Sequence, residues 1–354
     1  MTTSSDRSVP CLAAVIVARD EEPFIGRCIE SVLAAGAPYG GFEVVVVDSR
    51  STDRTAEIAR DHDVTTVRIR EGVRCTAALA RNVGQRLTRS RHVLFADGDT
   101  VIDGEWVRRA VALLDADPGV AGVAGKLCEI YYRGGVRVGE TADFFRMGPN
   151  AEEAYQLGGN AIYRRAALDE VGSFHGGVIS HEEAELAGRL RRSGARLVRI
   201  PLTVGVHHTG ARDGWEECWR RFRSGLMVGY GQVLRLSLGT TLFWSHARAL
   251  SRFMITLAFL ALGVVLLVVA ALSGRVEFAL AWLALGASVA VLFMIRARSI
   301  RRPVSVLAEW TLAAPCIVWG FARGALPTPS SPEVLAQVLH TRAGQVRELK
   351  TRSC

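Results

Sequence analysis

Two long stretches without a charged residue constrain the fold of this sequence more than any other feature. Residues 253–272 and 278–295 contain no Asp, Glu, Lys or Arg. Each stretch is close to the roughly 20 apolar residues that a helix needs to cross a bilayer. The sequence before about residue 245 has the composition of a soluble protein. We therefore expect a soluble N-terminal part and then a membrane region over 248–325, with spans at about 253–272 and 277–295.

The charges around these stretches predict how they cross a membrane. The loop at 273–277 carries one Arg and one Glu, whereas residues 296–303 carry four Arg. Cytosolic loops are enriched in Lys and Arg, so we expect 296–303 to face the cytosol with the N-terminal part, which begins without a signal-peptide pattern. The prediction is a multi-pass protein of the plasma membrane. A third apolar segment, 304–323, contains Glu309 and Pro315, which are costly in lipid, so both a span and an interfacial helix stay open.

The net charge of +8 comes almost entirely from arginine. Arginine is clustered at 189–199, 220–223 and 296–302. Such an excess fits nucleic acid, an anionic membrane surface or a phosphate-bearing substrate. The apolar stretches favour the last two, so we expect no nucleic-acid partner. The seven cysteines form no C-x-x-C pair, so we expect neither a zinc site nor a disulfide framework and interpret them as reduced residues of a cytosolic compartment.

The first part of the sequence alternates between apolar runs and amphipathic segments. Runs that are typical of buried strands occur at 12–18, 43–47, 64–69 and 91–100. Segments with apolar residues at helical spacing separate them. This order predicts an α/β domain with a mostly parallel sheet. Farther along the chain we expect two strands at 196–201 and 203–208, and one basic, aromatic helix at about 214–235.

Acidic residues follow three of these strands. Asp20 and Asp48 come after the first two, and Asp97 and Asp99 end the fourth. Ligands of open parallel sheets bind beyond the carboxyl ends of the strands. Carboxylates at D-x-D spacing suit Mg²⁺ or Mn²⁺ shared with a diphosphate. The alternative is a turn in which Asp and Gly serve the loop geometry.

Two pairs of residues farther along could also carry chemistry. In "SHEEAELAGRLRRSG", Glu182 or Glu183 could be a general base, or both could simply begin a helix favourably. In "VGVHHTG", His207 or His208 could offer a neutral imidazole to a metal, or the pair could be polar surface.

The segment "ECWRRFRSG" combines basic and aromatic residues just before the apolar stretches. Such a helix suits a membrane interface. Arg220, Arg221 and Arg223 could also hold a leaving diphosphate. Both roles can coexist, because 220 and 223 share a helix face that 221 does not.

Seven segments occur in order along about residues 10–230. They are "AAVIVARDEE", "EVVVVDSRSTDRT", "ALARNVG", "HVLFADGDT", "LGGNAIYRRAALDEVGSF", "HEEAELAGRLRRSGARLV" and "VGVHHTG". Together they resemble the family 2 glycosyltransferases of the GT-A fold. The resemblance implies an inverting transfer of a sugar from a nucleotide-sugar donor, with Mg²⁺ or Mn²⁺ bound.

The resemblance also implies roles for the residues that match the family motifs. Asp99 matches the metal-binding Asp of the D-x-D motif, and Asp97 its nucleotide-side partner and a second candidate ligand. Glu183 matches the catalytic base, with Glu182 beside it. His207 matches the histidine on the metal side.

The same match implies which residues bind the donor and the acceptor. The donor-binding residues within the matching segments are Ala18, Asp20, Glu21, Asp48, Ser49, Arg81 and Asp97, and Arg220 and Arg223, proposed above from their charge, complete the set. Gly159 and Asn160 match the acceptor side. Two positions depart from the family pattern. Ser49 stands where a second Asp often reads a uracil ring, and Glu183 replaces the usual Asp.

We therefore expect a membrane-anchored inverting glycosyltransferase whose acceptor is a hydroxyl of a lipid-linked or other glycan at the membrane. One alternative is a polyprenyl-phosphate sugar synthase, whose acceptor phosphate needs no base. Another is a non-catalytic membrane scaffold with a degenerate transferase domain. The expected domains are a flexible N-terminus at 1–10, a catalytic domain at 11–235, the membrane region at 248–325 with a possible third span at 304–323, and a tail at 326–354.

Overall fold

The computed structural model describes residues 9–211, 214–297, 301–327 and 335–341. Most of the expected flexible N-terminus therefore lies outside the described residues. The chain divides into two compact units. The sheet unit comprises Met1–Val178, Glu182–Gly210 and Pro327–Cys354, and the helical unit comprises Ile179–His181 and Ala211–Leu326.

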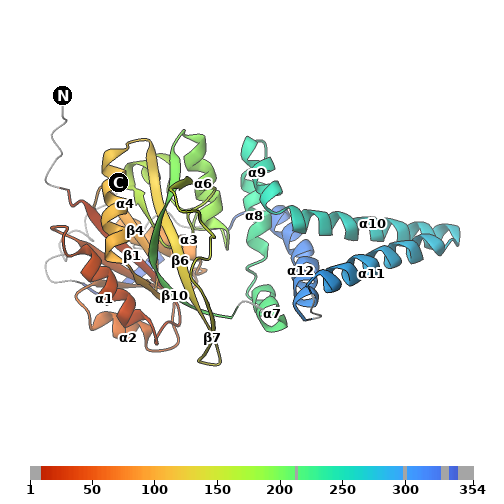
Figure 1. The fold of residues 1–354 in the computed structure, drawn as a ribbon, viewed down its shortest axis with the longest axis horizontal. Helices are drawn as coiled ribbons and strands as arrows, with labels where there is room; N and C mark the ends of the chain where they lie inside the picture. Colours follow the sequence, from red (N-terminus) through yellow and green to blue (C-terminus); the bar gives the residue numbers. More distant parts are fainter. Residues whose placement is uncertain (1–8, 212–213, 298–300, 328–334, 342–354) are drawn as a thin grey trace. The chain divides into compact units, whose positions relative to one another are not determined.

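Four parallel strands form the first half of the sheet (Figure 1). They are β3 (Thr65–Ile69), β2 (Glu43–Asp48), β1 (Leu12–Ala18) and β4 (His92–Asp97), in that spatial order. Nearly every residue of β1 and β2 is buried, as expected for strands covered on both faces. The predicted parallel arrangement is confirmed for these strands.

The second half of the sheet contains antiparallel pairs, so the whole sheet is mixed. The order continues from β4 through β9 (Ala161–Arg164), β6 (Val120–Arg133), β10 (Arg196–Gly210) and β5 (Thr100–Ile102). β9 is antiparallel to both of its neighbours, and β10 is parallel to β6. The short strands β7 (Val136–Thr141) and β8 (Glu152–Glu153) pair with β6 and β10.

The prediction of two strands at 196–201 and 203–208 was wrong, because β10 is one strand. Its pairing with β6 shifts register between Arg199 and Thr203, where Pro201 interrupts the ladder. A proline has no N–H to donate, so a local irregularity lets the strand continue past it.

Helices cover both faces of the sheet. One face carries α1 (Ile25–Gly36), α2 (Thr55–Arg60) and α4 (Gly104–Ala116). The other carries α3 (Ala77–Leu87), α5 (Arg165–Val171) and α6 (Glu182–Arg192). Ile29 of α1 and Trp106 of α4 are fully buried in one core, and Leu79 of α3 and Leu186 of α6 in the other. These two cores fix the helix ends near the carboxyl edge of the sheet.

A strand near the C-terminus completes the sheet. β11 (Ala336–His340) pairs antiparallel with β3, with Ala336 opposite Ile69. The sequence predicted only a tail at 326–354. The described part of that tail instead covers the outer edge of β3.

The helical unit begins with two helices where the sequence predicted one. α7 (Trp215–Arg223) and α8 (Val228–Leu236) are separated by a turn that contains Gly225, whose φ is 75°. A left-handed residue of this kind ends a helix. A further helix, α9 (Thr241–Ala249), was not predicted.

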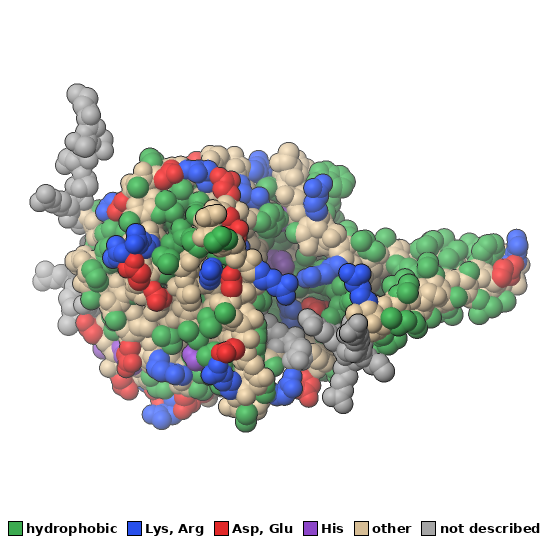
Figure 2. Space-filling view, viewed as in Figure 1, with side chains coloured by type: hydrophobic (Ala, Val, Ile, Leu, Met, Phe, Trp, Pro, Cys, Tyr) green, Lys and Arg blue, Asp and Glu red, His purple; other side chains and the backbone are tan. Residues whose placement is uncertain are grey.

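Three long helices follow: α10 (Ser251–Ser273), α11 (Glu277–Ala297) and α12 (Arg301–Arg323). By length and composition, Ser251–Ser273, Glu277–Arg296 and Pro303–Arg323 could each cross a membrane. Figure 2 shows that α10 and α11 present an almost unbroken hydrophobic surface. α12 stays helical through Pro315, and Glu309 is 2.9 Å from Arg221 of α7.

Candidate functional site

The carboxyl ends of β1 and β2 lie side by side, and the loops that follow them are tied together. The Asp20 carboxylate accepts a hydrogen bond from Thr52 N–H at 2.7 Å, and Asp20 N–H donates to Ser51 Oγ at 2.9 Å. Asp48 is fully buried and accepts from Ser51 N–H at 3.0 Å and from Arg68 Nε at 2.5 Å. This rim is therefore organised before any ligand binds.

Gly98 separates Asp97 from Asp99 because a larger residue has no room there. A Cβ at Gly98 would lie 2.8 Å from the Cβ of Ala18. Gly98 N–H donates to the Val17 carbonyl at 2.8 Å. The backbone thus passes tightly over the end of β1, and the two carboxylates flank that passage.

Asp99 and His207 meet because β5 pairs with β10, which places Thr100 opposite His207. Asp99 Oδ2 is 3.1 Å from His207 Nε2. The other ring nitrogen, Nδ1, is 3.1 Å from Glu129 Oε1, and the Tyr131 hydroxyl donates to Glu129 Oε2 at 2.7 Å. A carboxylate on the outer nitrogen is the usual support of a metal-binding histidine.

Negative charge is concentrated around this pair. Burial lowers the pKa of His207, but hydrogen bonds to Asp99 and Glu129 outweigh burial and raise it to about 10. Burial and then repulsion from Asp99 and Asp97 raise the pKa of Glu21 to about 8. Asp99 Oδ1 is buried and has no hydrogen-bond partner within the described part of the chain. A cation here would satisfy that oxygen and relieve the repulsion.

Arg81 of α3 links Asp97 to the start of α6. Its Nη2 donates to Asp97 Oδ1 at 2.8 Å, and its Nη1 donates to Glu182 Oε1 at 2.6 Å. The Arg81 side chain is 3% exposed, and its guanidinium lies 5.5 Å from the centre of the Phe174 ring. Its described polar contacts are to protein carboxylates, so its part in donor binding remains a prediction.

Glu182 and Glu183 begin α6 in different environments. The Glu182 side chain is 7% exposed and bonds directly to Arg81. The Glu183 side chain is 21% exposed and lies 3.7 Å from Arg81 Nη1. Burial and then repulsion from Glu182 raise the pKa of Glu183. Glu183 is thus the more accessible carboxylate and has a raised proton affinity, and both properties suit a general base.

The segment before β9 supports Asp97. Asn160 Oδ1 accepts from Asp97 N–H at 2.9 Å, and Asn160 Nδ2 donates to Asp97 Oδ2 at 3.3 Å. A Cβ at Gly159 would lie 2.3 Å from Asp97 Oδ2 and 2.6 Å from Arg81 Nη2. An acceptor-side role for Gly159 and Asn160 stays a prediction.

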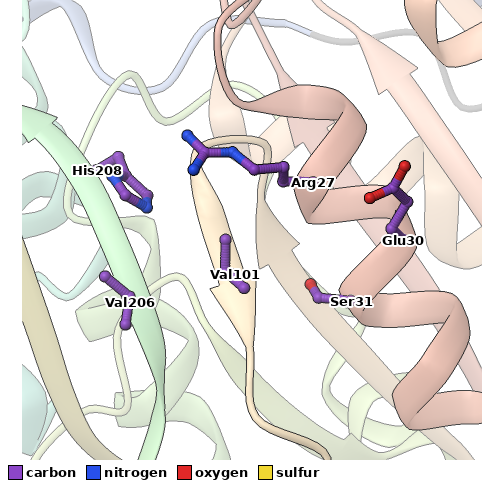
Figure 3. A pocket seen from close by; sticks show the side chains of 6 residues that line it. All are labelled: Arg27, Glu30, Ser31, Val101, Val206 and His208. Atoms are coloured by element: carbon purple, nitrogen blue, oxygen red, sulfur yellow. The ribbon is translucent and has the colours of Figure 1, made fainter.

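His208 occupies a different position from His207. Its ring stacks on Phe24 with the centroids 4.8 Å apart, and the Tyr132 hydroxyl is 3.0 Å from Nδ1. Neighbouring strand residues face opposite sides of a sheet, so the His207 ring contacts the Asp99 carboxylate, whereas His208 reaches Asp99 only through its backbone N–H, which donates to the Asp99 carbonyl at 2.9 Å. His208 instead borders a cavity of about 550 Å³, shown in Figure 3 and lined by Arg27, Glu30, Ser31, Val101, Val206 and His208.

The remaining predicted donor-binding residues fall in two places. Ser49 N–H donates to the Ala18 carbonyl at 2.9 Å and so joins the ends of β2 and β1. Arg220 and Arg223 lie on α7 of the helical unit, where both are exposed and Arg220 is 2.6 Å from Glu217.

Two residues of this site were missed by sequence reasoning. Glu129 is fully buried in the middle of β6, where it is the only acidic residue, and an acidic side chain within a strand was the available signal. Arg68 stands alone in β3 in the same way, opposite Asp48 in the parallel register. In both cases the partner becomes visible only once the strand order is known.

Comparisons with known proteins agree with the fold. The model of the family described as "Glycosyl transferase family 2" matches residues 13–172. The glycosyltransferase AglE of Haloferax volcanii is 28% identical over 234 residues, which are 64% of this chain and 74% of AglE. The glycosyltransferase EpsJ of Bacillus subtilis is 30% identical over 103 residues, which are 28% of this chain and 29% of EpsJ.

Two solved structures share the fold. The mannosyltransferase PcManGT of Pyrobaculum calidifontis, in complex with GDP-Man and Mn²⁺, aligns with a TM-score of 0.56 at 21% identity, over 88% of each chain. Residues 1–349 of S. aureus TarS align with a TM-score of 0.50 at 19% identity, over 68% of this chain and 73% of that one. Residues 13–172 therefore form a domain of the glycosyl transferase family 2 type, and the chain is a glycosyltransferase whose sheet unit has a GT-A-like fold.

Proposed function

We propose that this enzyme transfers a sugar, with inversion, from a nucleotide sugar to a hydroxyl of a lipid-linked acceptor at the cytosolic face of the plasma membrane. The observation that carries the proposal is that two separate groups of side chains lie at the carboxyl ends of the strands. Asp99 and His207 form one centre, and Glu183 lies at another that Arg81 joins to Asp97. Transfer of a sugar to a hydroxyl requires a site for the nucleotide sugar and, next to it, a base that takes the proton of that hydroxyl.

Asp99, Asp97 and His207 fit a divalent cation, Mg²⁺ or Mn²⁺. The buried Asp99 Oδ1 lacks a protein partner among the described residues, and Glu129 holds the outer nitrogen of His207. Oxygen and imidazole ligands of this kind suit both ions. When bound, the ion would neutralise charge on the leaving nucleoside diphosphate. The PcManGT complex, which contains GDP-Man and Mn²⁺, supports this assignment.

Glu183 would accept the proton of the acceptor hydroxyl. As the proton leaves, the hydroxyl oxygen forms a bond to the anomeric carbon, and the bond from that carbon to the diphosphate oxygen breaks. Attack from the side opposite the diphosphate inverts the configuration. Glu182 is held by Arg81, so its part would be to keep the start of α6 in place.

The helical unit supports a membrane-bound acceptor. Three helices are long and apolar enough to cross a bilayer. α7 carries a stack of Trp215, Trp219 and Phe222, with ring centroids 6.0 and 5.4 Å apart. Trp215 and Trp219 are exposed, and aromatic rings beside basic residues favour a membrane interface. We infer that α7 lies at the lipid surface and that the sheet unit stays in the cytosol.

The proposal is tested with the full chain in detergent or native membranes. Nucleotide release is measured from a panel of nucleotide sugars, with Mg²⁺, with Mn²⁺ and with EDTA. Lipid extract and soluble glycans are offered as separate acceptors, and the anomeric configuration of the product is read by NMR. We expect metal-dependent transfer to the lipid fraction with inversion. A retained configuration, or equal use of soluble acceptors, would contradict the proposal.

A further inference from the structure

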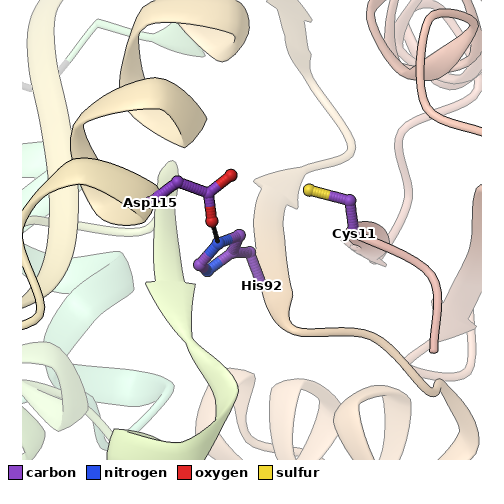
Figure 4. Close-up of side chains that lie close together, drawn as sticks. All are labelled: Cys11, His92 and Asp115. Atoms are coloured by element: carbon purple, nitrogen blue, oxygen red, sulfur yellow. Dashed lines mark hydrogen bonds and ion pairs between the residues drawn. The ribbon is translucent and has the colours of Figure 1, made fainter. Parts of the chain in front are cut away.

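We propose that Cys11, His92 and Asp115 form a second metal site, for Zn²⁺ or an ion of similar softness, at the sheet edge opposite the candidate catalytic site. Figure 4 shows the three side chains converging from separate elements. Their ligand atoms all lie within 4.8 Å of one another. One sulfur, one nitrogen and one oxygen donor are therefore grouped away from the carboxyl edge.

The pairing of β1 with β4 and the position of the end of α4 bring these three residues together. Cys11 comes just before β1, and His92 is the first residue of β4, which runs parallel to β1. His92 N–H donates to the Cys11 carbonyl at 2.9 Å. Asp115 lies in the last turn of α4, whose buried Leu114 anchors that turn in the core. The amino ends of two strands and the end of a helix thus share one point.

The donor set selects the kind of ion. Zn²⁺ binds thiolate, imidazole and carboxylate, whereas Mg²⁺ and Mn²⁺ prefer oxygen. Zinc bond lengths imply donor separations of roughly 3.3–3.7 Å in a tetrahedral site. His92 Nε2 and Asp115 Oδ1 are 2.8 Å apart, so that pair would open slightly while Cys11 closes in. Three protein donors leave the fourth position for water.

The protonation states of the donors are compatible with binding. His92 is 1% exposed, and burial lowers its pKa, so the ring is neutral, which is the form that binds metals. Burial raises the pKa of Cys11, so metal binding would release the thiol proton. Cys11 is half-buried and Asp115 is exposed, which leaves the site open to ions from solvent.

Two features weaken the site and predict an exchangeable ion. Arg91 Nη1 is 2.9 Å from Asp115 Oδ1, the same oxygen that faces His92, but both partners are exposed and such pairs are weak. His92 Nδ1 is buried without a hydrogen-bond partner in the described ranges. A metal on Nε2 would put the proton on Nδ1, where an acceptor normally supports it. We therefore expect weaker binding than at a closed four-ligand zinc site.

Cobalt is the probe that separates this site from the catalytic one. A thiolate ligand gives Co²⁺ a strong near-ultraviolet charge-transfer band, and neither Asp99 nor His207 can produce it. We expect this band in the wild-type chain, its loss on adding Zn²⁺, and its absence in Cys11→Ser. Asp115→Asn should weaken cobalt binding by about tenfold or more. Arg91→Gln should tighten it by up to about fivefold, because a competing cation is removed.

Matched variants make the result decisive. Asp99→Asn should keep the band, which excludes the catalytic site as its source. Cys128→Ser should also keep it, because Cys128 lies on β6 outside the cluster. Zn²⁺ should raise the midpoint of thermal unfolding for wild type but not for Cys11→Ser. The proposal is overturned if wild type shows no band, if Cys11→Ser retains it, or if Arg91→Gln weakens binding.

Discussion

Arg81 Nη1 lies 2.6 Å from Glu182 Oε1, so the first residue of α6 is held by a guanidinium that also holds Asp97. One buried cation therefore connects the end of β4 to the start of the helix that carries Glu183. The consequence is that the position of the candidate base and the position of the D-x-D carboxylate are set together.

Replacing Arg81 should damage stability and activity at once. Arg81→Gln leaves Glu182 buried without its partner, and breaking such a buried pair typically costs about 3–5 kcal/mol. Arg81→Lys keeps the positive charge but lacks the guanidinium, whose two terminal nitrogens reach two carboxylates. Its stability and activity should therefore lie between those of wild type and Arg81→Gln. Denaturant unfolding measures both variants. Arg108→Gln, on the exposed face of α4, is the control and should unfold like wild type.

Asp99→Asn tests the metal assignment. A carboxamide is a far weaker ligand for a hard cation, so transfer should be abolished while the fold is kept. Asp97→Asn should also weaken activity strongly. Nucleotide release and circular dichroism are measured on the same samples. Full activity of Asp99→Asn in EDTA would remove the metal from the mechanism.

Glu183→Gln and Glu182→Gln separate the two neighbouring carboxylates. Loss of a general base costs about 10²- to 10⁴-fold in rate, so Glu183→Gln should lose turnover on that scale while still binding donor. Glu182→Gln keeps an acceptor for Arg81 and should cost less. Single-turnover kinetics and donor titration give the two readouts. If neither substitution matters, the acceptor is already ionised, as a polyprenyl phosphate would be.

The raised pKa of Glu183 predicts a pH dependence with a definite sign. A general base works deprotonated, so the acid limb of the rate profile should lie above the ordinary glutamate range near 4.3. The same shift means that the folded protein binds this proton more tightly than the unfolded chain does. The resulting stability is full at low pH and is lost as pH rises through the folded pKa. Glu183→Gln should therefore raise the unfolding midpoint more at about pH 8 than at about pH 5.

The predicted orientation of the membrane region is tested by labelling in intact cells. Gly274→Cys, between α10 and α11, should react with a membrane-impermeant maleimide. Leu326→Cys, after α12, should react only when the membrane is permeabilised. Labelling of residue 274 solely by a permeant reagent would reverse the orientation that the arginines at 296–303 predict.

Features that depend on the local order of apolar and polar residues could be predicted from the sequence. Apolar runs located β1, β2, β3 and β4, and the same runs placed Asp48, Asp97 and Asp99 at strand ends. The continuity of β10 was missed because Pro201 looked like a strand end. The break between α7 and α8 was missed because Gly225 is flanked by residues that suit a helix.

The contacts that organise the site depend on register between distant strands, which local pattern does not contain. Glu129 supports His207 only because β6 and β10 are parallel neighbours with those residues opposite each other. Arg81 reaches Glu182 only because α3 and α6 cover the same face of the sheet. β11 was missed because "AQVLH" is too short to show an alternating pattern.

The strand β11 makes the membrane region an insertion into a single folded body, since Gly210 and Ala336 belong to the same sheet. A chain that leaves a body on one side of a bilayer and returns to it there must cross an even number of times. At most two of the three candidate helices would then be crossings, and α10 and α11 are the pair joined by a short turn. With the sheet unit in the cytosol, as we propose, we therefore expect α12, with Pro315 and the Glu309–Arg221 ion pair, to be an interfacial helix and not a third span.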